Sequence, residues 1–378
     1  MLPERLKQEL EKRMENNSLR ALSDKTYAID FYSNDYLGYA QSEEISEIVQ
    51  ALSKQTPGKH GSTGSRLISG NHKGFKLVEE KAAFLFKAES ALFYNSGYDA
   101  NIGLLSAVLK PKDLVFYDEL CHASIRDGLQ MVKSKTYKYK HGDYNDLEVQ
   151  IKRQSERLAF ENIYIVTESV FSMDGDITDI EELVTLKNKY NLHLIIDEAH
   201  AIGVCGREFK GLTIDYSTEL FARIITCSKA LGSHGAFVLG AKDLKLFLVN
   251  FSRALIYSTG ATPQHLQSVL ASLIHFEQEQ SSKQQLQYVI QYFRQHVKQL
   301  GLASRFLESK TAIQSYILSD NHKVKVLAEE LNEKGIGIKA ILHPTVPKGK
   351  ERLRICLHSF NTEAEIDDLL ETLTDCEK

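Results

Sequence analysis

The sequence lacks the features that mark several common classes of protein. Its five cysteines form no CxxC pair, which argues against a disulfide framework or a zinc site and fits a reducing cytoplasm. Basic residues (46) do not outnumber acidic ones (50), and no basic stripe indicates a nucleic-acid partner. No apolar run is long enough to span a membrane, and the charged N-terminus lacks the apolar core of a signal peptide. We therefore expect a cytoplasmic protein that binds no metal, nucleic acid or membrane.

What is present is typical of a globular enzyme-sized chain. Hydrophobic residues make up 43% of the sequence and charged residues 25%, so the chain can bury a sizeable core. Its 378 residues exceed one typical compact domain. Two packed lobes are the expectation.

A repeated pattern fills the region from Ala91 to about residue 230. Short apolar runs stop at polar residues, and helical segments follow them. Such runs are typical of buried parallel strands, and their polar tips lie at the edge of the sheet where ligands bind. The pattern predicts a mostly parallel sheet with helices on both faces. The expected strands are 91–94, 114–117, 162–166, 192–197 and the run that starts at Ile224.

The two ends of the chain have a different texture. A helix is expected within 3–22 and a short strand within 27–32. After Pro263, residues 264–300 predict a long helix or a helix pair, and an α+β lobe follows. Its expected strands are 312–318, 336–342 and 352–358, and its expected helices are 323–334 and 362–373. We therefore divide the chain into an N-terminal segment (1–50), a large domain (51–263) and a small C-terminal domain (264–378).

Two strand tips suggest chemistry on a carbonyl cofactor. Lys229 follows one apolar run, and Asp197 ends another run one strand-to-strand connection earlier. A lysine and a carboxylate brought together in this way suit Schiff-base chemistry, although a lysine just after a strand is more often a solvated helix start. Residues 94–97 (YNSG) would present a helix N-terminus to a phosphate. The glycine-rich loop 61–71 is no P-loop, because no Gly-Lys-Ser/Thr follows at the required spacing.

Five motifs in a fixed order resemble one family. They are 34–38 (NDYLG), 170–176 (VFSMDGD), 197–200 (DEAH), 226–229 (TCSK) and 352–354 (RLR). With them the chain resembles the α-oxoamine synthases, a group of fold-type I pyridoxal-phosphate (PLP) enzymes, from Arg20 to Arg354. The resemblance implies an α/β fold with a large, mostly parallel-sheet domain, a smaller α+β C-terminal domain and an N-terminal helical segment.

The resemblance also implies a set of cofactor contacts. Lys229 would bond the cofactor covalently and later move the substrate's α-proton, while Asp197 would pair with the ring nitrogen. His200 would contact the ring oxygen, and His122 would stack on the ring. The phosphate and other cofactor groups would be held by a set of small and hydroxylic residues: Gly97, Tyr98, Ser172, Thr226 and, from the partner subunit of a homodimer, Ser258 and Thr259.

The implied reaction is the decarboxylative condensation of an amino acid with an acyl thioester. Arg354, assisted by Asn34, would clamp the amino acid carboxylate. The 61–66 loop, the compact length and residues 341–347 most resemble the branch that joins L-alanine to pimeloyl-CoA or pimeloyl-acyl carrier protein in biotin biosynthesis. Arg20 and Thr345 would then contact substrate. Leu342 stands where this branch usually has arginine.

Other functions stay open at this stage. Within the family, the chain could be a glycine-using ligase or a serine-using sphingoid-base synthase. Outside it, the chain could be a catalytically silent PLP-fold partner subunit, which would be expected to have lost Lys229, Asp197 or Arg354. A phosphate-binding regulator is a further alternative, against which the pairing of Asp197 with Lys229 argues. Lys229, Asp197 and Arg354 are all present, which argues against the silent subunit.

Overall fold

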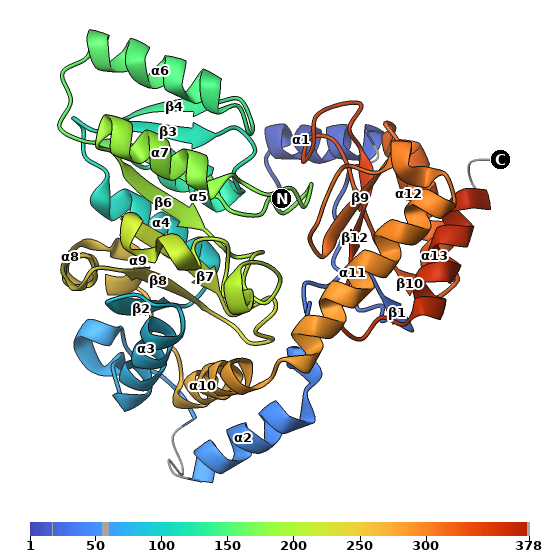
Figure 1. Ribbon diagram of the computed structural model, residues 1–378, viewed down its shortest axis with the longest axis horizontal. Helices are drawn as coiled ribbons and strands as arrows, with labels where there is room; N and C mark the ends of the chain where they lie inside the picture. The colour runs from blue at the N-terminus through green and yellow to red at the C-terminus, as the bar shows by residue number, and fades with distance from the viewer. Residues whose placement is uncertain (17, 55–59, 376–378) are drawn as a thin grey trace. The chain divides into compact units, whose positions relative to one another are not determined.

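The chain folds into two compact units in a computed structural model that describes residues 1–16, 18–54 and 60–375. The larger unit comprises Asp35–Ser172 and Asp176–Gln284. The smaller unit comprises Met1–Asn34, Met173–Gly175 and Gln285–Lys378. Figure 1 labels the elements of both units along the chain. The division into 1–50, 51–263 and 264–378 that we expect from the sequence stays a prediction. Residues 55–59 of its second segment lie outside the described residues.

A seven-stranded sheet organises the larger unit. The strand order is β2-β8-β7-β6-β5-β3-β4, and β8 alone runs antiparallel to its two neighbours. The strands are β2 (Ser90–Tyr94), β3 (Leu114–Asp118), β4 (Lys135–Tyr139), β5 (Ile163–Glu168), β6 (His193–Asp197), β7 (Ala222–Thr226) and β8 (Ala236–Gly240). All the parallel strands therefore end at one edge of the sheet, where their polar tips gather.

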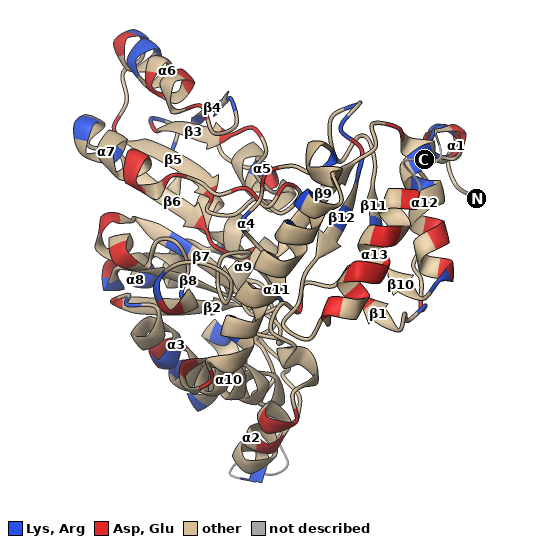
Figure 2. Ribbon diagram, turned by 45° about the vertical axis from the view of Figure 1, so that its right-hand side comes forward, with Lys and Arg blue, Asp and Glu red and all other residues tan. Residues whose placement is uncertain are grey.

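Apolar side chains leave both faces of this sheet. Along β5, Tyr164 and Val166 pack into one core cluster, whereas Ile163 and Ile165 pack into another. This alternation is what a strand produces when both of its faces are covered. In Figure 2 the strands are mostly tan, and the charged residues concentrate on the helices. The continuous apolar runs of the sequence are explained by this double burial.

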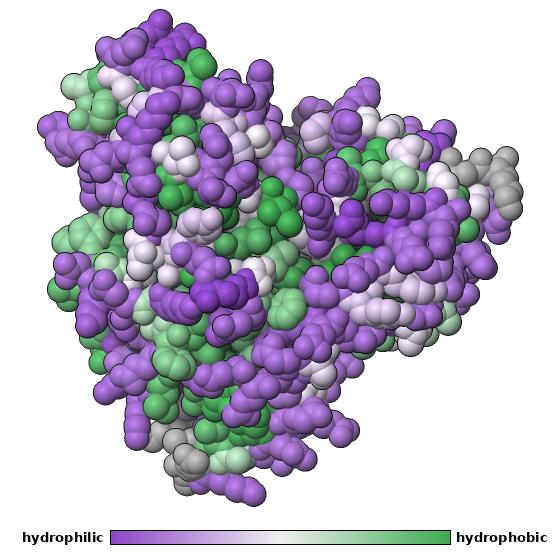
Figure 3. Space-filling view, viewed as in Figure 1, coloured by the Kyte–Doolittle hydropathy of each residue, from purple (hydrophilic) through white to green (hydrophobic). Residues whose placement is uncertain are grey.

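Helices cover the sheet and extend beyond it. In the larger unit these are α2 (Glu43–Lys54), α3 (Lys73–Leu85), α4 (Gly97–Val108), α5 (Ala123–Gln130), α6 (Tyr144–Arg157), α7 (Ile180–Tyr190), α8 (Lys242–Phe251), α9 (Arg253–Ile256) and α10 (Pro263–Gln278). The next helix, α11 (Ser281–Gln299), continues into the smaller unit. Residues 264–300 thus form a helix pair. On the face seen in Figure 3, hydrophilic and hydrophobic residues are interspersed.

The smaller unit is an α+β structure with two sheets. Its antiparallel sheet has the order β11-β12-β9, and β1 pairs with β10 in parallel. The strands are β1 (Ile29–Asp30), β9 (Ile313–Ile317), β10 (Ile336–Gly337), β11 (Lys339–Ile341) and β12 (Arg352–Cys356). The remaining helices are α1 (Glu4–Glu15), α12 (Asn321–Glu333) and α13 (Glu363–Asp375).

The predicted fold class is confirmed, with differences at the ends of elements. The N-terminal helix ends at Glu15, because the Asn16 side chain bonds the Lys12 carbonyl (2.7 Å) and competes with further helical bonding. The strands β4 and β8 were not predicted, since β4 is a short, largely polar segment (KTYKY) without an apolar run and β8 follows the lysine loop without a helix. Within the described ranges no helix is both long and apolar enough to cross a bilayer. Cys121, Cys205, Cys227 and Cys356 are free thiols, and Cys376 lies outside the described residues.

Candidate active site

The loop between β7 and β8 carries Lys229 and is closed by main-chain hydrogen bonds. Cys227 N–H donates to Gly235 O (2.8 Å), and Gly232 N–H donates to Lys229 O (2.7 Å). Gly232 has a positive φ of 58°, and a Cβ there would come within 2.3 Å of Ala40 N. Only glycine fits this turn, because both the backbone conformation and the space exclude a side chain. The main chain of Lys229 is therefore held on both sides.

The Lys229 side chain joins a short chain of proton-carrying groups. Its Nζ lies 2.5 Å from His200 Nε2, and His200 Nδ1 lies 2.7 Å from the hydroxyl of Tyr36. His200 and Tyr36 are both buried. A neutral imidazole has one donor and one acceptor nitrogen, so it can accept from the lysine and donate to the phenol, or the reverse. The chain of three groups can thus hold a proton on Lys229 at one end or on Tyr36 at the other.

Two carboxyl groups lie side by side at the tips of β5 and β6. Glu168 and Asp197 are partners in the strand register, and both are buried. Asp197 accepts from the Asn101 side chain (2.7 Å) and from Ala199 N–H (2.9 Å). Burial, and then the charge of Asp197, raises the pKa of Glu168 to about 8, while Lys229 acts in the opposite direction. The Glu168 carboxyl group therefore mainly keeps its proton at neutral pH.

His122 belongs to the same cluster. Its main-chain N–H donates to Glu168 Oε1 (2.6 Å), and its ring Nδ1 lies 2.8 Å from Ser124 Oγ in the first turn of α5. Desolvation lowers the pKa of His122; Asp197 opposes this shift, and Lys229 adds to it. The ring is therefore mainly neutral at pH 7. Lys229, His200, Asp197 and His122 are thus brought together, as predicted from the sequence.

The N-terminus of α4 forms an anion-binding arrangement with hydroxyl groups of the lysine loop. Ser96 caps the helix by accepting from Asp99 N–H (3.0 Å), which leaves the N–H groups of Gly97 and Tyr98 in the first turn. A Cβ on Gly97 would lie 3.8 Å from Thr226 Oγ1. Thr226 Oγ1 in turn lies 2.8 Å from Ser228 Oγ. Helix N–H groups and hydroxyls in one place suit a phosphate. The side chain of Tyr98 is half exposed and donates its hydroxyl to Asp127.

Three further predicted cofactor residues lie on irregular segments. Thr259 is next to the turn before α4 in the same chain, because Asn95 Nδ2 donates to its carbonyl (2.9 Å). Ser258 precedes it and is half-buried. Ser172 is half-buried on a hairpin that starts from the bridge between Val170 and Ile177. The assignment of Ser258 and Thr259 to a partner's cofactor stays a prediction.

The predicted substrate residues lie in the smaller unit. Arg354, on β12, is 7% exposed and donates from Nη2 to Asn34 Oδ1 (2.9 Å). Arg20 and Thr345 line one cavity of about 760 Å³, together with Tyr27 and Lys339. The structure therefore brings Asn34 to Arg354 and Arg20 to Thr345 within this unit.

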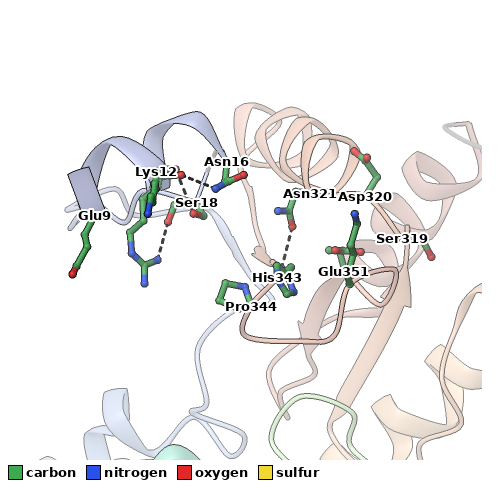
Figure 4. A pocket seen from close by; sticks show the side chains of 12 residues that line it. Glu9, Lys12, Asn16, Ser18, Ser319, Asp320, Asn321, His343, Pro344 and Glu351 are labelled. Carbon is green, nitrogen blue, oxygen red and sulfur yellow. Dashed lines mark hydrogen bonds between the residues drawn. The ribbon is translucent and has the colours of Figure 1, made fainter. Parts of the chain in front are cut away.

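A second cavity of the smaller unit, of about 680 Å³, lies between α1 and the start of α12 (Figure 4). Asn321 Oδ1 accepts from His343 N–H (3.0 Å) at its wall. His343 and Pro344 line both cavities. Its lining mixes charges of both signs, such as Lys12 and Glu351, so it indicates no ligand of one charge.

Four residues of the site escaped the sequence interpretation: Tyr36, Asn101, Glu168 and Ser228. Tyr36, Glu168 and Ser228 stand inside or next to the quoted motifs, so their positions were a usable signal. Asn101 lies within α4, and only the fold places it beside Asp197.

A comparison with protein families matches residues 26–373 to the model described as aminotransferase class I and II. The chain belongs to this family. That membership accords with the resemblance drawn from the five motifs.

Two curated relatives illustrate the similarity over most of the chain. A protein of Glaesserella parasuis named "putative 8-amino-7-oxononanoate synthase" is 38% identical, over 91% of this chain and 90% of its own length. The "8-amino-7-oxononanoate synthase" of Emericella nidulans is 37% identical, over 92% and 88%.

Solved structures extend the comparison. The 8-amino-7-oxononanoate synthase of Francisella tularensis is 26% identical with a TM-score of 0.76, covering 92% of this chain and 97% of its own. A serine palmitoyltransferase from S. paucimobilis has a TM-score of 0.87 at 21% identity, covering 98% and 96%. At that identity the second similarity supports the fold alone.

Proposed function

We propose that this protein is a PLP-dependent acyltransferase that condenses L-alanine with a pimeloyl thioester and gives 8-amino-7-oxononanoate for biotin biosynthesis. The products would also include carbon dioxide and the free thiol of coenzyme A or acyl carrier protein. The observation that carries the proposal is the whole-length similarity to relatives of that name, joined to the lysine, histidine and carboxylate cluster at the sheet edge.

The residues present fit PLP. The amine of Lys229 suits the cofactor's aldehyde, and the N-terminus of α4 with Thr226 and Ser228 suits its phosphate. The buried carboxylate of Asp197 suits a protonated ring nitrogen, because it has a neutral side-chain donor and no arginine partner among the described residues. When bound, PLP supplies a ring that accepts electrons from the α-carbon of an amino acid.

The chain's own groups would divide the remaining work. Lys229 Nζ would take the α-proton, and the imidazole of His200 would hold or return a proton through Tyr36. The neutral ring of His122 would stack on the cofactor, fixed by Ser124 and Glu168. Ser172, Ser258 and Thr259 would complete the cofactor contacts, the last two from the partner subunit of a homodimer.

Substrate recognition would use the smaller unit. Arg354 has a planar fork of donors that matches a carboxylate, and its bond to Asn34 fixes the orientation of that fork. The cavity lined by Arg20 and Thr345 offers room and positive charge for the acyl substrate. We also propose a cytoplasmic location, because the scattered cysteines fit a reducing compartment.

The choice of amino acid provides the sharpest test. L-Alanine should shift the visible absorption band of the holoenzyme at a lower concentration than glycine or L-serine. A lower dissociation constant for glycine would favour a glycine-using ligase, and one for L-serine would favour a sphingoid-base synthase. A wild-type protein that shows no visible band after addition of PLP would instead support a catalytically silent subunit. Product formation from pimeloyl-CoA and from pimeloyl-acyl carrier protein would identify the thioester.

A further inference from the structure

A charged group of three residues lies in the larger unit, outside the contacts assigned above. The ring of His141 bridges two carboxylates: Nδ1 lies 2.9 Å from one oxygen of Asp118, and Nε2 lies 2.7 Å from Asp176 Oδ2. The sequence alone gave no reason to single out His141, which resembles an ordinary surface histidine. In the fold, its side chain is only 23% exposed.

The two carboxylates come from different parts of the chain. Asp118 is buried at the tip of β3, where it also accepts from Leu120 N–H (2.9 Å) and Gly142 N–H (3.2 Å). Asp176 lies on the returning arm of the hairpin 170–177, and its other oxygen is buried without a hydrogen-bond partner among the described residues. His141 therefore ties this hairpin arm to the tip of β3, beside the hydrogen bond from the Thr178 hydroxyl to the Glu168 carbonyl (2.6 Å).

The same histidine also contacts the other arm of the hairpin. Its ring meets the ring of Phe171 edge-on, with centroids 4.4 Å apart. Phe171 N–H donates to Asp176 O (3.1 Å), which joins the two arms. Ser172 follows Phe171 directly. The contacts of His141 thus fix both sides of the base from which Ser172 extends.

The charge of His141 suits this bridging role. Burial disfavours the cation, but the hydrogen bonds and charges of Asp118 and Asp176 outweigh it and raise the pKa of His141 to about 10. Glu119 Oε1 also faces the His141 main-chain N–H (3.4 Å), and the phenol of Tyr144 lies near both carboxylates. An imidazolium has a donor on each nitrogen, whereas a neutral imidazole has only one.

We propose that His141 is a positioning residue that, as an imidazolium between Asp118 and Asp176, anchors the hairpin 170–177 and so places Ser172 for contact with the cofactor. This inference rests on the proposed PLP-dependent function. It predicts that the loss of the bridge acts on cofactor binding through Ser172 and not only on folding.

The test is a double-mutant cycle on the affinity of the apo-protein for PLP. His141→Asn keeps a polar side chain but cannot bridge both carboxylates, and it should raise the dissociation constant of PLP about tenfold. Ser172→Ala should have a similar effect, and the double variant should bind no more weakly than the weaker single variant. His193→Asn is the matched control, since that ring packs on Tyr164 and Phe221 elsewhere in the unit; it should bind PLP as the wild type does.

Hydrogen exchange of the holoenzyme gives a second readout. Amides of residues 170–177 should exchange faster in His141→Asn than in the control, because the hairpin base is released. Additive effects in the cycle, or wild-type PLP affinity in His141→Asn, would overturn the inference while leaving the proposed function intact. If His141→Asn does not fold, Asp176→Ala removes the acceptor of one contact of the bridge and is judged by the same results. A wild-type protein that fails to bind PLP overturns the proposed function itself.

Discussion

Two consecutive acidic residues at the end of β6 have opposite surroundings. Glu198 is fully buried and accepts from Arg223 Nε (2.9 Å) and Nη2 (2.6 Å), from Thr213 N–H (3.0 Å) and from the Thr213 hydroxyl (2.6 Å). Asp197 has one amide side chain, one main-chain N–H and a second carboxyl group, Glu168, beside it.

The difference separates Glu198, whose charge is paired within the fold, from Asp197, whose charge we propose is kept for a ligand. The negative charge of Glu198 is neutralised inside the chain by Arg223, and the Thr213 side chain and main chain add two hydrogen bonds. Among the described residues Asp197 has no arginine partner, and burial together with Asp197 raises the pKa of the neighbouring Glu168. A buried carboxylate in that condition is stabilised when a cationic group arrives, which is the property a cofactor site needs.

Among the substitutions that test this comparison, removal of Lys229, which belongs to the cluster around Asp197, should have the largest effect on activity. Lys229→Ala should lower the activity by about 10⁴-fold or more and abolish the visible absorption band, because the covalent anchor and the base are lost together. Lys133→Ala, an exposed lysine of the same unit, is the control and should keep both. A visible band of unchanged intensity in Lys229→Ala would show that another residue bonds the cofactor.

Replacement of Asp197 or Glu198 by its amide should affect different properties: activity for Asp197 and stability for Glu198. Asp197→Asn should lower the activity at least about a hundredfold and leave the free energy of unfolding of the apo-protein within about 1 kcal/mol. Glu198→Gln should instead cost about 3–5 kcal/mol of stability, because Arg223 is left buried and unpaired. Denaturant unfolding and steady-state kinetics on both variants measure the two effects. Equal losses of stability in the two variants would contradict the distinction.

The last prediction concerns a pH dependence of stability due to Glu168, which is gradual in any one pH unit. Its pKa is raised in the fold from 4.5 to about 8, so between these values the unfolded chain has released a proton that the folded chain still holds. The stability of the apo-protein should therefore fall as pH rises through this window, by up to about 1.4 kcal/mol per pH unit from this group.

Glu168→Gln cannot ionise but keeps an acceptor for the His122 N–H. The variant should show a flatter profile of unfolding free energy between pH 5 and 8 than the wild type, and should be the more stable of the two at pH 8. Thermal unfolding of both apo-proteins across this range measures the difference. Parallel profiles would mean that Glu168 is already ionised in the folded protein at neutral pH.

The sequence was sufficient for the features that depend on local pattern. Apolar runs ending at Asp197 and Lys229 predicted the parallel strands and their tips, and the motifs predicted which side chains share the sheet edge. The strand β8 was missed because it returns directly from the lysine loop, so the strand–helix alternation fails there. Asn101 was missed because its role depends on how α4 packs, and His141 because its two carboxylates are far away in sequence. Long-range contacts of this kind leave no local periodicity.

The reversed strand β8 has a consequence for the order in which the site can form during synthesis. Strand β2 is the first strand of the large sheet, and its single neighbour there is β8, the last one. The chain from Tyr94 to Ala236 must therefore be made before β2 can pair, which is a slow, long-range closure. The turn after β2 carries the helix N-terminus that we propose for the phosphate, and the loop before β8 carries Lys229. Both halves of the proposed cofactor site thus come together only when β2 pairs with β8, so a ribosome-bound chain that ends before Gly240 should bind no cofactor.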